Sequence, residues 1–178
     1  MTPKDFVAAY AVYARETYAK TGILPEIILA QAALESGYGK HAPGNMFFGV
    51  KDFDGINGNE QLVTTFEYSK RGDLTAAQIG LASVTRVEPT TLAGQKYFKY
   101  TGKAYFRKYE TPEACFTDHA RVFMTARKNG ALRYEKALAV KDNPDRFFEE
   151  IQKAGYAQSP IYAKTLSSIC KTIKTYLV

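Results

Sequence analysis

The sequence is poor in the residues on which several common kinds of active site depend. It holds two cysteines, two histidines and no tryptophan among 178 residues, and no CxxC, HExxH or Walker-type glycine segment. A zinc site or a histidine-activated nucleophile is built from such residues, so we expect no metal and no cofactor. Cys115 and Cys170 lie in helix-like segments with apolar neighbours, which predicts buried free thiols rather than a disulfide scaffold.

Long apolar stretches are also absent. No run of about 18 apolar residues occurs, so the sequence predicts no membrane-spanning helix and no membrane insertion. The start, MTPKDFVAAYAVYARETYAK, has no basic segment leading into an apolar core and no small-residue cleavage site. It does not resemble a signal peptide. Use inside a cell, release by another route and removal of a leader are all consistent with it.

Basic residues outnumber acidic ones. The 24 lysines and arginines and 18 aspartates and glutamates give a formal net charge of +6, with a pI near 9.2. A positive protein is attracted to polyanions such as nucleic acid, acidic lipids or an acidic cell wall. The basic residues are scattered, with the densest groups at 106–109 and 126–130, and no nucleic-acid-binding motif is present. We therefore expect no nucleic-acid partner.

Proline just after a capping residue marks the start of several predicted helices. Thr2-Pro3 predicts a helix that continues to about residue 20, and GILPEIILAQAALES predicts a second one from Pro25. Further helices are predicted over 111–126, 131–140, 143–155 and 159–177, with Thr111, Asn143 and Ser159 each standing before a proline.

Residues 52–103 differ in kind from the segments on either side. They contain six glycines and β-rich pieces such as QLVTTFEY and LASVTRV, which predict an extended, β-rich lobe. The order predicts one α+β domain over 1–178 that is mainly α. We expect a helical lobe of about 1–51 and 104–178, a β-rich lobe of about 52–103, and a substrate cleft between them.

The predicted second helix is apolar on nearly every side and ends in a carboxyl group, that of Glu35. Only Glu26 and Gln31 are polar between residues 23 and 34, so the helix is expected in the core. Glu35 follows Gln31 by one turn and extends a mostly buried face. Loss of water and the negative helix C-terminus both raise the pKa of a carboxyl group, which suits a general acid. The residues alone leave open a solvated Glu35, or one paired with Lys40, His41 or Lys51.

Four segments in chain order carry a family resemblance. They are LAQAALESGYGK followed by NMFFGVK, VTTFEY (63–68), YFRKYETPEACFTDHARVF (105–123) and AGYAQSPIYAKTL (154–166). These segments resemble the glycoside hydrolase family 73 glucosaminidases, which are bacterial and phage peptidoglycan hydrolases, over about residues 3 to 176. The resemblance implies a lysozyme-like body and an endo-β-N-acetylglucosaminidase that cleaves β-1,4 bonds of the glycan strand. A muramidase or lytic transglycosylase, and a wall-binding module without catalysis, are the alternatives.

The resemblance also implies site residues. Glu35 matches the general acid, Glu67 the proposed second carboxylate, and Tyr156 the tyrosine near the reacting sugar. The expected substrate-binding residues are Tyr38, Asn45, Phe47, Phe48, Lys51 and Tyr162. The aromatic rings at 38, 47 and 48 are candidates for stacking on a sugar. It further implies action at the bacterial cell wall, in the periplasm or outside the cell, by a protein that we expect to be a monomer.

Simpler structural roles stay open for several of these residues. Glu67 is also consistent with an exposed strand residue or a partner of Lys70, and Tyr156 and the rings at 38, 47 and 48 with core packing. Substitutes for Glu67 nearby are Glu60, Asp54 and Asp73. If Glu67 activates water, the reaction inverts and the two carboxyl groups lie about 6.5–9.5 Å apart; alternatively, the N-acetyl oxygen of the substrate is an internal nucleophile.

The sequence departs from the family pattern at several positions. Tyr38 stands where the family often has tryptophan, and YAQSP replaces the more usual Tyr-Ala-Thr-Asp-Pro. His119 stands where the family usually has tyrosine. Asn45 lies in the segment Asn45-Met46-Phe47-Phe48, which fits the Asn-Leu-Phe pattern of the family only loosely.

Overall fold

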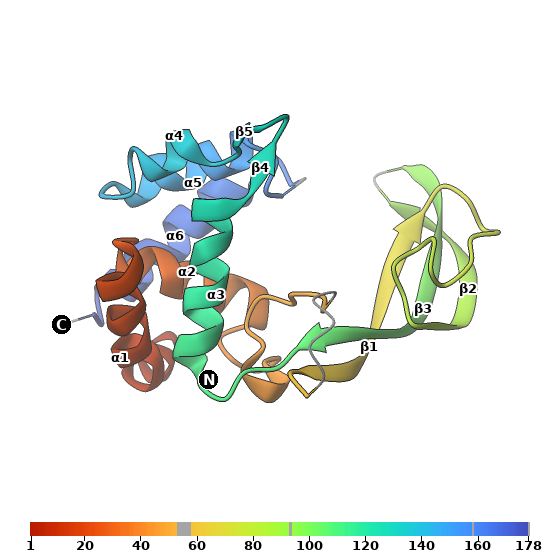
Figure 1. The fold of residues 1–178 in the computed structure, drawn as a ribbon, viewed down its shortest axis with the longest axis horizontal. Coiled ribbons are helices and arrows are strands. Elements are labelled where there is room, and N and C mark those ends of the chain that lie inside the picture. The colour runs from red at the N-terminus through yellow and green to blue at the C-terminus, as the bar shows by residue number, and fades with distance from the viewer. Residues whose placement is uncertain (53–57, 93, 158, 178) are drawn as a thin grey trace. The chain divides into compact units, whose positions relative to one another are not determined.

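The computed structural model describes residues 1–52, 58–92, 94–157 and 159–177. They form two compact units, Met1–Phe48 with Tyr109–Val178, and Gly49–Lys108. We call them the helical unit and the β unit. The helical unit contains α1 (Pro3–Thr21), α2 (Pro25–Ser36), α3 (Pro112–Thr125), α4 (Glu135–Leu138), α5 (Pro144–Lys153), α6 (Tyr162–Lys174), a 3-10 turn (Pro43–Asn45), and short strands β4 (Arg127–Lys128) and β5 (Ala131–Leu132) (Figure 1).

The β unit is a three-stranded antiparallel sheet. Its strands are β1 (Glu60–Ser69), β2 (Ser83–Leu92) and β3 (Gln95–Arg107), in the order β1-β3-β2 (Figure 1). The pieces QLVTTFEY and LASVTRV predicted β1 and the start of β2. The central strand β3 was not predicted as an element and continues past residue 103. The α+β, mainly α class is confirmed, and none of the described helices is both long and apolar enough to cross a membrane.

Capping residues set three helix starts as predicted. The side-chain oxygens of Thr2, Thr111 and Asn143 each accept a hydrogen bond from a backbone N–H three residues later, at 3.2, 3.1 and 3.2 Å. Proline occupies the first turn in each case, where its missing N–H costs nothing. Each cap contributes about 1 kcal/mol to helix stability.

Two predicted helices are shorter than expected. The last one begins at Tyr162 rather than at Ser159-Pro160, because residues 159–161 form a turn in which the Tyr162 N–H donates to the Ser159 carbonyl. The segment 131–140 is helical only over α4, because Asn129 and Gly130 both have positive φ and turn the chain into the β4–β5 hairpin. An Asn-Gly pair is a known hairpin signal.

The helical unit packs around α2. Ile27, Leu29 and Ala30 of this helix are fully buried, as the nearly all-apolar segment predicted. The large rings and branched side chains that complete the core come from the other helices: Phe6, Phe116, Phe123, Phe147, Phe148 and Leu166. This core fixes the end of α2, where Glu35 lies.

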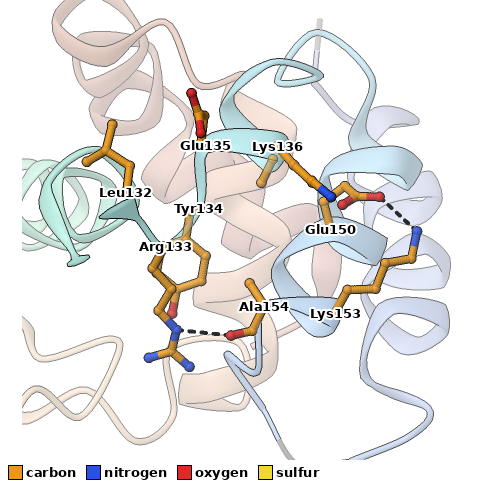
Figure 2. Close-up of a pocket in the computed structure, with 9 residues that line it drawn as sticks. Leu132, Arg133, Tyr134, Glu135, Lys136, Glu150, Lys153 and Ala154 are labelled. Carbon is orange, nitrogen blue, oxygen red and sulfur yellow. Dashed lines mark hydrogen bonds and ion pairs between the residues drawn. The ribbon is translucent and has the colours of Figure 1, made fainter. Parts of the chain in front are cut away.

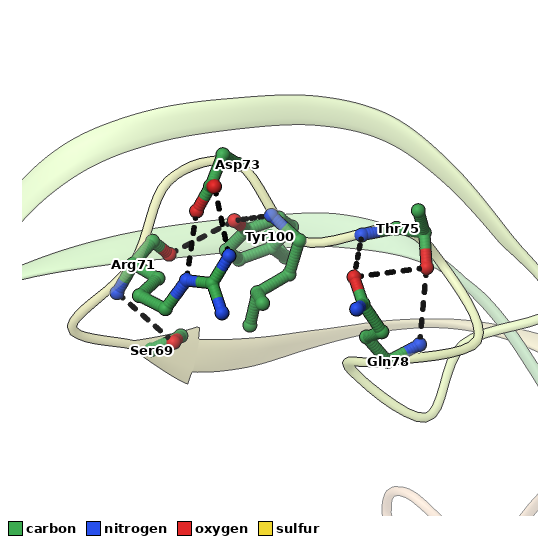
Figure 3. A network of polar contacts seen from close by, with 7 residues as sticks. Ser69, Arg71, Asp73, Thr75, Gln78 and Tyr100 are labelled. Carbon is green, nitrogen blue, oxygen red and sulfur yellow. Dashed lines mark hydrogen bonds and ion pairs between the residues drawn. The ribbon is translucent and has the colours of Figure 1, made fainter.

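In the β unit, a loop over residues 70–82 is tied to the sheet through Tyr100. The buried Tyr100 hydroxyl donates to the Arg71 carbonyl at 2.9 Å and accepts from the Leu74 N–H at 3.0 Å (Figure 3). Arg71 also pairs with Asp73 at 2.8 Å, within the same loop. The loop is therefore an ordered part of the unit, and it carries Gly80 to the side chain of Lys51.

Candidate active site

Glu35 lies in the last turn of α2, where the chain leaves the helix sharply. Gly37, Tyr38 and Gly39 have successive φ values of 59°, 56° and 78°. The left-handed region is natural for glycine but costly for other residues, which explains the two glycines around Tyr38. The Tyr38 N–H donates to the Ala33 carbonyl at 2.8 Å and closes the helix end.

The Glu35 carboxyl group is held by one neutral polar side chain, which a second neutral side chain holds in turn. The Tyr162 hydroxyl donates to Glu35 Oε1 at 3.2 Å, and Gln31 Nε2 donates to the Tyr162 hydroxyl at 3.5 Å. Gln31 is 1% exposed and Tyr162 is 7% exposed, so the relay runs from the core outward. Gln31 was visible in the sequence as a lone polar residue one turn before Glu35, but its partner on α6 was not.

The surrounding protein raises the pKa of Glu35. Partial desolvation is the main cause, and the hydrogen bond from Tyr162 acts in the opposite direction. Glu35 extends the mostly buried face of α2 and is partly desolvated, as expected, but its side chain is exposed at the point where α2 emerges from the core. Its solvent-accessible surface decides what can reach it, whereas the protein crowded around it decides the pKa. An acid of this kind is both protonatable and accessible.

Tyr156 lies close to this acid. Its ring is 5.7 Å from that of Tyr162, and its hydroxyl is 2.6 Å from His119 Nε2. Burial raises the pKa of Tyr156, and the charge of Glu35 raises it further. The phenol therefore keeps its proton and offers a neutral hydroxyl beside the carboxyl group.

His119 is the polar neighbour of Tyr156. In the sequence it stood out only as a departure from the family pattern. It is 5% exposed on α3, and its ring stacks on Phe48 at a centroid distance of 3.7 Å and an interplanar angle of 9°. Burial lowers the pKa of His119 to about 3, so the imidazole is neutral. The contact with Tyr156 joins residues 37 positions apart, and no sequence spacing predicts it.

The segment before Tyr156 is braced by Arg133. Its Nε donates to the Ala154 carbonyl at 3.0 Å (Figure 2). Its Nη2 donates to the Gly155 carbonyl at 2.6 Å. Arg133 lines a pocket of about 310 Å³ at α4 and α5, together with the Lys153–Glu150 ion pair of 2.7 Å. None of the predicted site residues lines this pocket. We therefore assign Arg133 a structural role, which is to hold the backbone just before Tyr156.

The predicted substrate-binding residues of the helical unit divide into three groups. Phe47 is 2% exposed between Tyr10 and Phe116, so its ring has no free face for a sugar and the stacking interpretation of Phe47 is wrong. Asn45 Nδ2 donates to the carbonyls of residues 109 and 110 at 2.9 and 3.2 Å. Its side chain therefore joins two loop segments of the helical unit. Tyr38 and Phe48 are partly buried against the core, Tyr162 is 7% exposed within it, and all three stay candidates.

Glu67 and Lys51 lie in the β unit and contact each other. Lys51 Nζ lies 2.5 Å from Glu67 Oε1 and donates to the Gly80 carbonyl at 2.9 Å. The ion-pair partner of Glu67 is thus Lys51, where the sequence suggested Lys70. Lys51 and Gly80 also line a cavity of about 300 Å³ within this unit.

The other acids considered in place of Glu67 have local contacts or lie outside the described residues. Glu60 accepts from the Gly58 N–H at 2.7 Å, and Asp73 pairs with Arg71. Asp54 lies outside the described residues.

The two cysteines are free and buried, as predicted. Burial raises the pKa of Cys115 and of Cys170 to about 12, so both are inert thiols. Within the part of the chain that the structure describes, no three His, Cys, Asp or Glu side chains gather as metal ligands.

A protonatable carboxyl group at the edge of a packed helix is what a glycoside hydrolase needs for its general acid. Residues 11–175 match the glucosaminidase family, described as mannosyl-glycoprotein endo-beta-N-acetylglucosaminidase. The chain therefore belongs to this glycoside hydrolase family, and the resemblance drawn from the four ordered segments is confirmed.

Curated relatives share this family across much of the chain. It is 30% identical over 172 residues to peptidoglycan hydrolase FlgJ of Pseudomonas aeruginosa and 29% identical over 167 residues to exo-glucosaminidase LytG of Bacillus subtilis. These alignments cover 97% and 92% of this chain, but 37% and 49% of the relatives. The chain thus spans about a third to a half of the length of these two relatives.

Solved structures agree on the fold. The glycoside hydrolase domain of Salmonella typhimurium FlgJ matches with a TM-score of 0.64 and 26% identity, over 98% of this chain and 90% of that one. The catalytic domain of the autolysin Auto from Listeria monocytogenes matches with a TM-score of 0.71 and 21% identity, over 99% and 87%. The second likeness concerns the fold alone. The expected lysozyme-like fold class is confirmed.

Proposed function

We propose that this chain hydrolyses the glycan strand of peptidoglycan as an endo-β-N-acetylglucosaminidase, with Glu35 as the general acid. The observation that carries the proposal is the end of α2, where Glu35 has a raised pKa, is accessible, and accepts a hydrogen bond from Tyr162. Family membership supports the reaction class. FlgJ is a peptidoglycan hydrolase, which supports the substrate class, and LytG is an exo-glucosaminidase, which supports the kind of bond.

The contacts of Glu35 suit both halves of a proton transfer. Before transfer, the raised pKa favours the protonated acid that a departing glycosidic oxygen needs. After transfer, the hydrogen bond that Tyr162 donates stabilises the carboxylate that is left. Tyr156 adds an uncharged hydroxyl close to the reacting sugar, suited to the N-acetyl group or to the attacking water.

The second carboxylate remains a proposal with two readings. In one, Glu67 is a base that activates water and gives inversion. In the other, the N-acetyl oxygen of the substrate attacks as an internal nucleophile, and Glu67 is not required for catalysis. In both readings the Glu67 carboxyl group starts in contact with Lys51, at 2.5 Å.

The setting that we propose is the bacterial cell wall, reached in the periplasm or outside the cell. The net charge of +6 suits a wall rich in peptide carboxylates. We propose a monomer that binds glycan strands and that has no nucleic-acid partner and no cofactor.

The test is mass spectrometry of borohydride-reduced digestion products from purified peptidoglycan. Wild type is expected to release fragments with N-acetylglucosamine at the reducing end, as oligosaccharides, and Glu35→Gln is expected to release none. Muramic acid ends would make the chain a muramidase, and anhydro-muramic ends a lytic transglycosylase. Release of single sugars would indicate exo cleavage. Undiminished digestion by Glu35→Gln would overturn the assignment of the acid.

A further inference from the structure

The reaction proposed above gives no role to the contact between His119 and Tyr156. This contact links the middle of α3 to the segment after α5, with 2.6 Å between His119 Nε2 and the Tyr156 hydroxyl oxygen. It is shorter than either hydrogen bond in the relay that holds Glu35, at 3.2 and 3.5 Å. A buried polar contact of this length is costly to lose and specific in direction.

The imidazole of His119 is fixed before any ligand arrives. One face stacks on Phe48 at 3.7 Å, and its ring meets the ring of Phe123 at 5.1 Å and 86°. A tilt of the imidazole plane would break both aromatic contacts, whereas a half-turn about χ2 would preserve them. Core packing therefore fixes the plane of the ring, and the contact with Tyr156 fixes which edge carries Nε2 toward the hydroxyl.

The protonation state of His119 is also fixed. Burial lowers the pKa of His119 to about 3, with the charge of Asp118 acting in the opposite direction. A neutral imidazole has one donor and one acceptor nitrogen, whereas a tyrosine hydroxyl is both donor and acceptor. The hydrogen bond therefore forms with either tautomer. In the tautomer protonated at Nδ1, Nε2 is the acceptor and fixes the direction of the Tyr156 O–H bond.

We propose that His119 is a positioning residue for Tyr156 in the proposed glycosidase reaction. A phenol hydroxyl turns about its C–O bond, so the direction of the Tyr156 O–H bond near the charge of Glu35 depends on its hydrogen-bond partners. With Nε2 as the acceptor, the bond to His119 holds this hydrogen in place and leaves the hydroxyl oxygen to act as an acceptor. This inference rests on the proposed function, because it requires that Tyr156 contributes to the reaction.

The first test is a double-mutant cycle on soluble glycan strands. His119→Phe keeps a ring for stacking on Phe48 and removes the hydrogen bond. We expect kcat to fall about tenfold to a hundredfold, because a misplaced group costs about that much, with KM within about twofold. Tyr156→Phe should fall at least as far. The double variant should equal Tyr156→Phe within about twofold, since the two residues act as one unit.

Rescue separates positioning from packing. His119→Gln restores a neutral hydrogen-bonding group without a ring, and we expect it to recover part of kcat. Thermal melting accompanies every variant, so that loss of fold is recognised directly. A wild-type kcat in His119→Phe or in Tyr156→Phe would overturn the inference, as would independent, multiplicative losses in the double variant. Glu35→Gln separates this failure from that of the proposed function, because the function stands if that variant alone is inactive.

A second measurement needs no active variant. The chain has only two histidines, and His41 is exposed, so a long-range ¹⁵N–¹H correlation spectrum resolves both rings. In Tyr156→Phe, the Nε2 resonance of His119 should shift, whereas the resonances of His41 should not. An unchanged His119 resonance would overturn the inference.

Discussion

The two predicted catalytic carboxyl groups lie in different units and in opposite kinds of environment. Glu35 of the helical unit accepts a hydrogen bond from a neutral tyrosine and has a raised pKa. Glu67 of the β unit forms an ion pair with Lys51 at 2.5 Å. A neutral partner is compatible with a protonated acid, whereas an ammonium partner suits an ionised carboxylate. The proposed donor and acceptor roles thus rest on the two environments, since residue type alone leaves these roles equal.

The largest expected effect separates the two carboxyl groups directly. Glu35→Gln should lower the rate about a thousandfold or more, since general-acid catalysis is worth about 10²–10⁴. The measurement is release of reducing ends from purified peptidoglycan, with the fold checked by circular dichroism. Glu26→Gln, the same change in the first turn of the same helix, should keep wild-type activity. Equal loss in both variants would mean that α2, and not its acid, is what the change disturbs.

The corresponding change in the β unit should have a smaller effect. Glu67→Gln should lower the rate about a hundredfold if Glu67 activates water, with Glu60→Gln at the start of β1 as the matched control. NMR of the anomer released first reports whether the reaction inverts. A Glu67→Gln enzyme within twofold of wild type would exclude Glu67 as the base and favour the N-acetyl oxygen.

The neutral partner of Glu35 has its own signature. Tyr162→Phe keeps the ring and removes the hydrogen bond that lowers the pKa of Glu35. The pKa should rise, so activity should persist to higher pH on the alkaline limb, while the maximal rate falls about tenfold because the product carboxylate loses its donor. The pH profile of kcat on soluble glycan strands measures both. An alkaline limb that moves to lower pH would contradict the assigned contact.

The smallest effect concerns stability. A folded-state pKa raised above the unfolded value means that the native state binds more protons, so stability falls as pH rises from the unfolded to the folded value of Glu35. Glu35→Gln removes this loss and should raise the melting temperature at neutral pH by about 1–2 °C. At pH 3 Glu35 is protonated in both the folded and the unfolded state. The melting temperatures of wild type and Glu35→Gln should then agree. A lower melting temperature at neutral pH would show that the carboxylate is stabilised in the fold.

Local signals in the sequence predicted the elements well and the contacts poorly. Helix starts were predictable at Thr2, Thr111 and Asn143, because a capping side chain bonds to a backbone N–H only two or three residues away. Glu35 was predicted as a site residue because its helix is so apolar. The exposure of its side chain was not predicted, because exposure depends on where α2 leaves the core.

Contacts between distant segments account for the rest of what the sequence left unpredicted. Tyr162 lies 127 positions from Glu35, and Lys51 was expected to bind substrate rather than Glu67. His119 differed from the family pattern, yet its partner Tyr156 depends on how α3 packs. Pairings of this kind are set by packing across the core, which no local spacing reports.

The neutral groups around Glu35 have a consequence for ionic strength. Gln31, Tyr162, Tyr156 and the uncharged His119 carry no charge for salt to screen, whereas exposed ion pairs weaken as salt is added. The acid is therefore expected to keep its properties in the dense counterion layer of a polyanionic wall. Salt dependence of the reaction would then report on the Lys51–Glu67 pair and on wall binding, and not on the proton donor.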